Sequence, residues 1–337
     1  MSISAADIPD KTFLQTVGDR RSIRYYDPDK TVEDWKIQTI LQTARRASCQ
    51  GNINATEAIV VKRGEDLDLW DEIEECVSGF NVQIINQSSH LIFWLTNLNA
   101  WYGRANDGLS SLSLSGALTK YHGWNYEFTM TQTVPRLMSF PTERTENLLR
   151  FETGQAVGAA TLAVSALDLG SILIAFGRKP GGVEKAFGLT PNLKFTWAHA
   201  IGYPLEDFKA GGQRPRLKFS KLFHKGAYGV PLEPDDAVDA ALTEKGLHQE
   251  QSPTAGRIQE IDDLAARFSR DPGVVSWPDK EVRRLLVDDD WDFGPNIRAR
   301  AEEVLAAGGL PEYPEEMKET FKKLLEEHNI DTTKYLG

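Results

Sequence analysis

The chain has 337 residues, of which 41% are hydrophobic and 26% are charged, a composition ordinary for a soluble globular protein. Its formal net charge of −11 arises in the last third, because residues 231–337 hold 25 acidic and 13 basic side chains. An acidic balance disfavours nucleic-acid binding, which needs a basic face, and no apolar run approaches the roughly 18–20 residues that span a bilayer.

The first residues, 1–7, have neither the basic nor the apolar region of a secretory signal. Cys49 and Cys76 lack the spacing of metal ligands, and we expect no metal site. A single disulfide between them is possible, but reduced thiols in a cytoplasmic protein are the favoured interpretation.

Strands and helices alternate over the first 230 residues. Apolar residues at helical spacing begin at Phe13 and recur over 35–44, where residues 31–34 predict a capped helix start. Short apolar runs predict buried strands over 58–61 and 89–95, a strand or extended loop over 171–176, and a strand closed by a turn over 195–204. Further helices are expected over 183–189 and over 152–169, the latter apolar on most sides, buried, and closed by Gly170 in a left-handed cap. This order predicts an α+β core.

Aromatic residues gather between about 100 and 145, where the regular pattern loosens. One of these rings is expected to stack on a substrate, the alternative being packing against the core or a partner subunit. The candidates, with one histidine of the same segment, are Trp101, Tyr102, Tyr121, His122, Trp124, Tyr126 and Phe128. His199, on an apolar strand, is instead expected to be a core residue with satisfied ring nitrogens.

Three basic residues and a serine lie within five positions, in the run Arg20-Arg21-Ser22-Ile23-Arg24. Such a cluster repels itself unless an anion or carboxylates neutralise it, and the planar arginine fork suits bidentate phosphate contacts. Taken alone, the run is more typical of a basic surface turn paired with acidic residues. Arg214 and Arg216 form a second basic pair. Alternate residues on an extended segment point to the same side, so these two arginines could bind one phosphate together. An exposed basic loop is the alternative for that pair.

Asn52 and Asn54 precede the first predicted strand. Their carboxamides offer both donors and acceptors, which suits the edge of a heterocycle, although ordinary turn chemistry explains them as well.

The order of these features resembles the FMN-dependent nitroreductase family. In that family an Arg-x-Ser-x-Arg/Lys run opens the domain, and a Ser...Asn-x-Gln-Pro-Trp loop precedes a strand. A Gly-Leu-Gly-Ser step, a Gly-Tyr-Pro turn and a Lys/Arg-x-Arg segment follow. The corresponding stretches here are 20–24, 48–56, 168–171, 200–204 and 214–216, so that the resemblance covers about residues 11–225.

The resemblance implies a mixed, mainly antiparallel central sheet flanked by helices, in a homodimer with FMN at the subunit interface. It assigns the FMN phosphate, ribityl chain and ring edge to Arg20, Arg21, Ser22, Arg24, Arg214 and Arg216. The isoalloxazine hydrogen bonds fall to Asn52 and Asn54, and one flavin face to the backbone of Ile172, Leu173 and Ile174. Residues 1–228 would form the FMN-binding domain with a variable lid at about 100–145, and residues 229–337 an acidic, mainly helical C-terminal extension.

Two departures concern the substrate. The family's Gln-Pro-Trp is Asn54-Ala55-Thr56 here, which shortens one amide and removes a bulky ring, and the extension after about 230 exceeds the minimal family. We expect an FMN-dependent oxidoreductase with flavin-borne, ping-pong chemistry, in which NADH or NADPH reduces the flavin and a nitroaromatic, quinone-like or other conjugated small molecule reoxidises it. The alternatives are a specialised flavin dehydrogenase or reductive-elimination enzyme for one metabolite, and a flavin- or partner-binding protein with little turnover.

Overall fold

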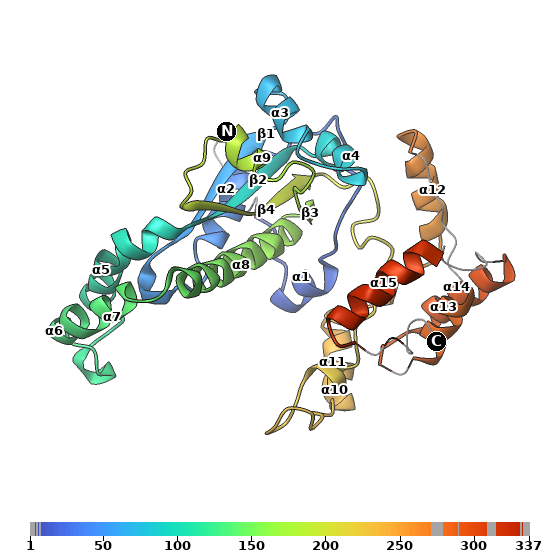
Figure 1. Cartoon of the computed structure of the whole chain (residues 1–337). Helices are drawn as coiled ribbons and strands as arrows, with labels where there is room; N and C mark the ends of the chain where they lie inside the picture. Colours follow the sequence, from blue (N-terminus) through green and yellow to red (C-terminus); the bar gives the residue numbers. More distant parts are fainter. Residues whose placement is uncertain are drawn as a thin grey trace. The chain divides into compact units, whose positions relative to one another are not determined.

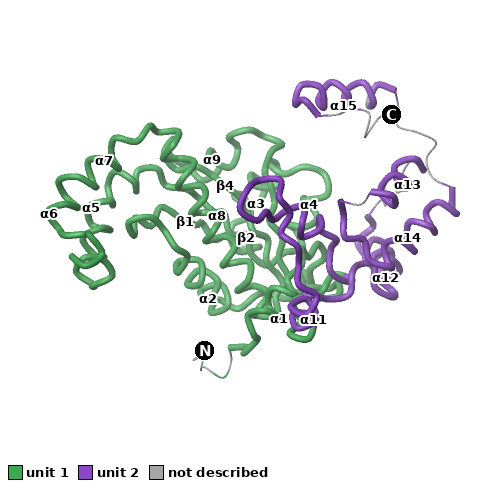
Figure 2. The backbone as a smooth tube through the Cα atoms, turned by 90° about the horizontal axis from the view of Figure 1, so that it is seen from below, with its two compact units in different colours: residues 1–210, 244–247 green, residues 211–243, 248–337 purple. Residues whose placement is uncertain are grey.

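The computed structural model describes residues 4, 6, 8–270, 279–288, 290–308, 315–330 and 332. The chain divides into two compact units, residues 1–210 with 244–247 and residues 211–243 with 248–337 (Figure 2). The first unit contains the whole sheet, and the second is built from helices and loops (Figure 1). The division falls at 210/211, before the boundary expected at 228/229.

Four strands form one antiparallel sheet in the order β1-β2-β4-β3. Their bounds are β1 Thr56–Lys62, β2 His90–Asn97, β3 Gly170–Ile174 and β4 Leu193–Gly202. All four strands and their antiparallel pairing agree with the sequence prediction, and observed ends lie within a few residues of the expected ones.

Helices surround the sheet in unit 1. They are α1 Phe13–Asp19, α2 Asp34–Ala44, η2 Gln50–Asn52, α3 Leu67–Glu74, α4 Phe80–Gln87, α5 Leu98–Leu114, η3 Lys120–His122, α6 Tyr126–Phe128, η4 Thr129–Thr133, α7 Val134–Met138, α8 Thr142–Ala166 and α9 Gly182–Ala186. The described part of unit 2 holds α10 Phe219–Leu222, α11 Asp236–Glu244 (whose last residue falls in unit 1), α12 Arg257–Arg267, α13 Asp279–Val287, α14 Pro295–Ala306 and α15 Glu315–Glu327.

The central strand β2 is buried along nearly its full length because apolar clusters cover both of its faces. Phe93 packs on one face with residues of α3, α4 and α9, and Trp94 packs on the other with α2 and α8. The alternation of side chains along a strand sends these neighbours to opposite faces. A third cluster joins α5 to α7 around Trp101.

The long helix α8 begins at Thr142, ten residues before its predicted start, and lies along the sheet (Figure 1). The prediction of Gly170 as its left-handed cap is wrong: the left-handed residue is Asp168, with φ of 55°, and Gly170 opens β3. The capped start predicted for α2 is also absent, because Glu33 occupies the N-cap without a side-chain hydrogen bond.

Candidate functional site

The run 20–24 lies alongside the first residues of β3. Ser22 forms a parallel bridge with Ser171, and the Ile23 amide donates to the Ser171 carbonyl at 3.0 Å. Four residues on, Tyr26 bridges Pro204, beyond the end of β4. Three motifs that are far apart in the sequence, the arginine run, the Gly-Ser step and the Gly-Tyr-Pro turn, are therefore in direct contact in the fold.

Two glycines allow this close approach. A Cβ on Gly170 would lie 2.8 Å from Cγ2 of Ile23, and one on Gly202 would lie 2.9 Å from Cδ1 of Tyr26. Neither distance is possible for a real side chain, and both contacts involve buried side chains. Gly170 is therefore explained by packing against the arginine run, rather than by the helix cap expected from the sequence.

The arginines of the run have different surroundings. Arg21 is buried, and its guanidinium donates to the carbonyl oxygens of Gly18 and, at 2.9 Å, of Arg20, so that it satisfies the C-terminal end of α1. Arg20 and Arg24 are only half-buried, and Arg24 donates to the Ser22 carbonyl at 3.1 Å. Arg20, Ser22 and Arg24 are thus the better placed members for meeting a ligand, while Arg21 has a structural role in addition to any contact.

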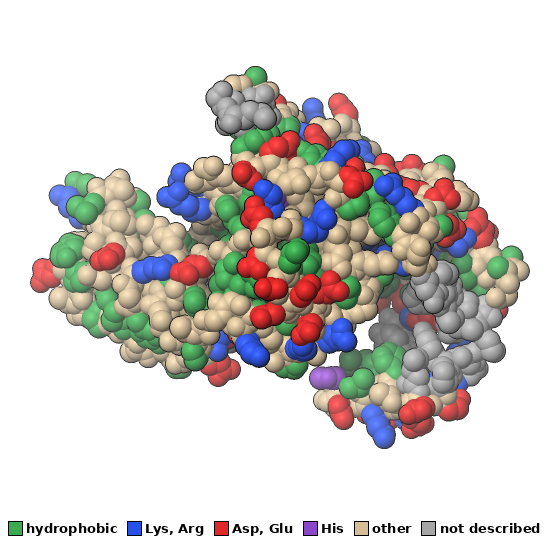
Figure 3. Space-filling model, turned by 90° about the horizontal axis from the view of Figure 1, so that it is seen from above, with side chains coloured by type: hydrophobic (Ala, Val, Ile, Leu, Met, Phe, Trp, Pro, Cys, Tyr) green, Lys and Arg blue, Asp and Glu red, His purple; other side chains and the backbone are tan. Residues whose placement is uncertain are grey.

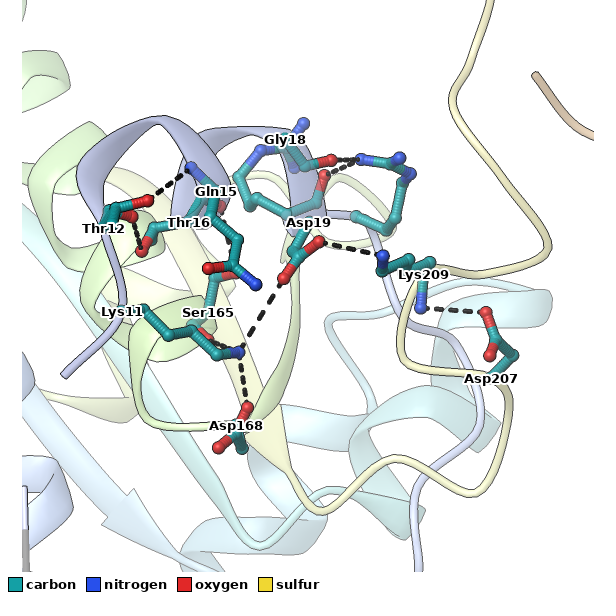
Figure 4. Close-up of polar contacts among 12 residues, drawn as sticks. Lys11, Thr12, Gln15, Thr16, Gly18, Asp19, Ser165, Asp168, Asp207 and Lys209 are labelled. Atoms are coloured by element: carbon teal, nitrogen blue, oxygen red, sulfur yellow. Dashed lines mark hydrogen bonds and ion pairs between the residues drawn. The ribbon is translucent and has the colours of Figure 1, made fainter. Parts of the chain in front are cut away.

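A buried carboxylate organises further cations beside the run (Figure 4). Asp19, the last residue of α1, lies 3.3 Å from Nζ of Lys209 and 3.9 Å from Nζ of Lys11. Lys11 also pairs with Asp168 and lies over the ring of Phe208. Neither lysine was predicted as a site residue, because each stands apart from the basic clusters along the chain.

The amide loop docks against α5. Gly51, Asn52 and Asn54 have φ of 60°, 55° and 56°, a conformation that glycine and asparagine adopt most readily. Asn52 donates to Oγ of Ser111 at 2.9 Å. A Cβ on Gly108 of α5 would lie 2.3 Å from the Gly51 carbonyl oxygen, so this helix position must be glycine for the loop to lie so close.

A cavity of about 720 Å³ opens beside this loop. Its volume falls in the range of small-molecule sites. It is lined by Leu41, Ala44, Arg45, Arg46, Ala47, Ser48, Cys49, Asn52, Asn54, Ala55, Thr56, Glu57, Ala58, Trp94, Arg104, Glu152 and Ala156. The two asparagines predicted to contact a flavin are among these residues, whereas Arg45, Arg46, Arg104 and Glu152 were not predicted.

Glu152 connects the loop to α8. Its Oε1 accepts the Gln50 amide at 2.7 Å, and its Oε2 is buried and has no hydrogen-bond partner within the described part of the chain. Burial raises the pKa of the Glu152 carboxyl, although the Gln50 hydrogen bond opposes this effect.

The arginine run and the amide loop stand at diagonally opposite corners of the sheet. Asn54 precedes β1 at one edge, where Thr56 pairs with Thr96, and the run adjoins β3 at the other edge, where Gly170 pairs with Gly202. Three strand spacings and the length of β4 separate these corners by about 30 Å. One copy of the chain does not bring the two groups together.

Arg214 and Arg216 belong to unit 2, so their joining with the run of unit 1 stays a prediction. The neighbouring glycines serve packing within unit 2, rather than ligand approach. A Cβ on Gly211 would meet Cδ of Arg257 at 2.1 Å, and one on Gly212 would meet the Ser252 amide nitrogen at 2.7 Å. Arg216 itself is exposed.

The predicted flavin-facing stretch of β3 presents mixed surroundings. Ile174 is buried in the core, Ile172 is half-buried, and Leu173 is exposed. Because Ile174 packs among core residues, only the backbone of this stretch or the side chain of Leu173 is suited to a ligand.

None of the aromatic lid candidates lines the 720 Å³ cavity. Trp101 is fully buried and donates to the Leu137 carbonyl, which favours the packing alternative for this ring. The exposed candidates are Tyr102, Tyr121, His122, Tyr126 and Phe128, and Trp124 packs edge-on against Phe128. His122 caps η3 by pairing its Nδ1 with Thr119.

His199 is buried in the middle of β4, as expected, but the expectation of satisfied ring nitrogens is wrong. Neither nitrogen has a partner within the described residues, and burial lowers the pKa of its imidazole to about 3.

The model of the nitroreductase family matches residues 17–203, more than half of the chain, and the chain belongs to this family. This span contains the arginine run, the amide loop and the Gly-Ser step, and it ends within the Gly-Tyr-Pro turn, at Tyr203; the match confirms the resemblance and the fold class expected from the sequence. Members of the nitroreductase family are flavin oxidoreductases that bind FMN.

Solved structures share the fold at low identity. A Staphylococcus epidermidis protein provisionally named an NAD(P)H:FMN oxidoreductase is 15% identical, with a TM-score of 0.51, over 59% of this chain and 90% of that one. An enone reductase of gut-bacterial fatty acid saturation is 15% identical, with a TM-score of 0.50, over 59% and 92%. A provisionally named nitroreductase from Exiguobacterium sibiricum, in complex with FMN, is 19% identical, with a TM-score of 0.49, over 59% and 90%. No curated protein matches the chain. Within the described residues, no helix has both the length and the apolar character that membrane crossing requires.

Proposed function

We propose that the chain is an FMN-dependent oxidoreductase that uses NADH or NADPH to reduce a nitroaromatic, quinone-like or other conjugated small molecule. The contact of the arginine run with the Gly-Ser step and the Gly-Tyr-Pro turn carries this proposal. This contact supports the proposal because guanidinium and hydroxyl groups that suit a phosphate lie beside the first residues of β3, where Gly170 makes room for Ile23. When bound, FMN would supply the redox chemistry, accepting electrons from the nicotinamide and passing them to the substrate.

The residues of this chain would bind and orient the cofactor. Arg20, Ser22 and Arg24 offer guanidinium and hydroxyl donors to a phosphate, with Lys209 held nearby by Asp19. The loop amides would orient the ring edge, since the side chains of Asn52 and Asn54 line the cavity. The small apolar walls of the cavity would exclude water from the reacting atoms.

The diagonal arrangement of these two groups supports a homodimer. Because about 30 Å of sheet separates the arginine run from the amide loop in one copy, a cradle that uses both must take them from different copies. We propose that FMN lies between two subunits, with the run of one copy and the loop of its partner copy.

The proposed setting is the cytoplasm, and the proposed partners are small molecules. Both cysteines are free thiols, which fits a reducing compartment. On the face shown in Figure 3, basic side chains are scattered among acidic and apolar ones, which gives no support to a nucleic-acid interface.

The test is the absorption spectrum of the purified protein, followed by anaerobic addition of NADH or NADPH. We expect an FMN band that either nucleotide bleaches, and a mass of two copies at micromolar concentration. The double variant R20A/R24A should lose at least about 100-fold in FMN affinity, because each of the two charge-assisted contacts is worth about 1.5–3 kcal/mol.

The matched control is R178A, which removes an exposed arginine after β3 and should keep the wild-type FMN affinity. Equal FMN affinity in all three proteins would overturn the assignment of the run. A monomeric mass with bound FMN would overturn the dimer.

A further inference from the structure

The cavity beside the amide loop has an excess of basic side chains that the proposed cofactor does not explain. Arg45, Arg46 and Arg104 line it, against Glu57 and Glu152. In the proposed dimer, the phosphate of the FMN beside this loop is assigned to the arginine run of the partner copy, and an oxidised isoalloxazine carries no charge. A second group of arginines therefore calls for a second anion.

The guanidinium of Arg104 is already paired with other residues of the protein. It pairs with Glu57 at 2.8 Å and donates to the Asn54 carbonyl at 2.7 Å, so it neutralises one of the two glutamates and anchors the loop. Glu57 also accepts from Asn97 at 2.7 Å. This pair leaves no net charge for a ligand.

Arg45 and Arg46 are in a different position. Both are exposed at the C-terminal end of α2, and neither forms an ion pair within the described chain. Among the described residues, the side chain of Arg45 donates a hydrogen bond to the neutral amide of Gln42, at 3.2 Å. A helix C-terminus favours a nearby cation, but that effect does not require two guanidinium groups on the wall of one cavity.

Glu152 does not balance these two arginines. Its Oε1 is taken by the Gln50 amide, and neither Arg45 nor Arg46 forms an ion pair with it. Because burial raises the pKa of its carboxyl, Glu152 holds its proton to a higher pH than an exposed glutamate.

The rest of the cavity wall suits the flat, apolar part of a ligand. Ala44, Ala55 and Ala156 are small and buried, and Trp94 adds a large buried ring. A site with small apolar walls at one part and paired guanidinium groups at another fits a planar molecule that ends in a carboxylate.

We propose that the substrate is a conjugated carboxylic acid whose carboxylate is bound by Arg45 and Arg46. This inference rests on the proposed function for the reduction, but the binding of the acid can be measured separately. Arg45 and Arg46 are specificity-determining residues in this proposal, and they take no part in electron transfer.

The test compares 4-nitrobenzoate with methyl 4-nitrobenzoate, which share the nitroaromatic ring and differ in charge. In the balanced reaction, each acceptor with one NAD(P)H and one proton gives the nitroso compound, NAD(P)⁺ and water. We expect the ratio of kcat/KM for the acid over the ester to fall by about tenfold in R46A, and further in R45A/R46A, as charge-assisted contacts are lost. In R178A this ratio should match wild type.

Calorimetric titration of 4-nitrobenzoate into the FMN-loaded protein gives a second readout that needs no turnover. The Kd should rise by about tenfold in R46A, and ester binding should not change. Raised ionic strength should weaken acid binding alone, since exposed charges are screened.

The FMN spectrum and its bleaching by NAD(P)H are measured on the same samples. If FMN is bound and bleached but the acid-to-ester preference and the Kd are the same in wild type, R46A and R45A/R46A, the carboxylate inference is overturned and the proposed function stands. If no FMN is bound or bleached, the proposed function fails. An arginine-dependent Kd for 4-nitrobenzoate would then still support an acid-binding cavity.

Discussion

The imidazole of His199 should make the stability of the protein depend on pH. Its pKa in the folded chain is about 3, against an ordinary value of 6.5, because the ring is fully buried without a partner. Below pH 6.5 the unfolded chain therefore binds a proton that the folded chain refuses. The contribution of the neutral ring to stability is complete above pH 6.5 and is lost progressively as the pH falls toward 3.

The magnitude follows from the gap between the two pKa values. Each pH unit within the gap corresponds to about 1.4 kcal/mol, so lowering the pH from above 6.5 to 5 should reduce the free energy of unfolding by about 2 kcal/mol through His199 alone. The variant H199L removes both the titration and the unpaired nitrogens. At pH 7.5 it should be as stable as wild type or more stable by about 1–2 kcal/mol, because an apolar side chain needs no hydrogen bond.

Urea unfolding followed by tryptophan fluorescence at pH 5, 6 and 7.5 measures this effect. The difference between wild type and H199L should widen toward pH 5. The control is H122Q, which changes an exposed histidine of the same unit and should keep the wild-type pH dependence. Equal pH dependence in wild type and H199L would refute the reasoning, as would a loss of more than about 2 kcal/mol in H199L at pH 7.5, since that would reveal a partner for the ring.

Two further substitutions test the packing and the polar contact that shape the site. In G170A the new Cβ would overlap Ile23, so we expect a loss of about 1–3 kcal/mol in unfolding free energy and weaker FMN retention. The control is G103A on α5, where nothing lies within 4 Å of the new Cβ, and it should be neutral or slightly stabilising. Similar losses of unfolding free energy in G170A and G103A would contradict the contact between Gly170 and Ile23. E152A leaves the Gln50 amide without its acceptor and should cost about 1–3 kcal/mol, whereas E152Q keeps an acceptor. Burial raises the pKa of Glu152, so wild type should lose unfolding free energy as the pH rises above 4.5, whereas E152Q does not titrate there. The unfolding free energy of E152Q relative to wild type should therefore increase with pH. A constant difference between pH 4 and 7 would argue against a raised pKa of Glu152.

The strands and the family were predictable because their signals are local. Runs such as 89–95 are apolar over the length of a strand, and the motifs keep their order along the chain. The contact between the arginine run and β3 was implied only by the resemblance. Its physical basis, a glycine that must pack against Ile23, depends on tertiary structure.

The missed residues share a different property. Lys11 and Lys209 are solitary in the sequence and meet only because Asp19 is buried between the segments that carry them. Arg45 and Arg46 are typical of a helix end, and the cavity beside them is formed by residues of α2, α8 and β1 that no short motif connects. Long-range proximity of this kind leaves no periodic or spacing signal.

Gly108 fixes the position of the amide loop independently of the side chains that the loop presents to the cavity. The loop is located by the contact of the Gly51 carbonyl with a bare stretch of α5, a contact that involves none of the side chains at 54–56. Asn54 has a left-handed φ of 56° and Ala55 is buried, so substitutions at these two positions are limited to residues that keep that backbone and that volume. The Asn-Ala-Thr that replaces the family's Gln-Pro-Trp fits these limits, since asparagine adopts a left-handed φ readily and alanine is small, and it changes the amide and removes the ring that the loop offers to a ligand.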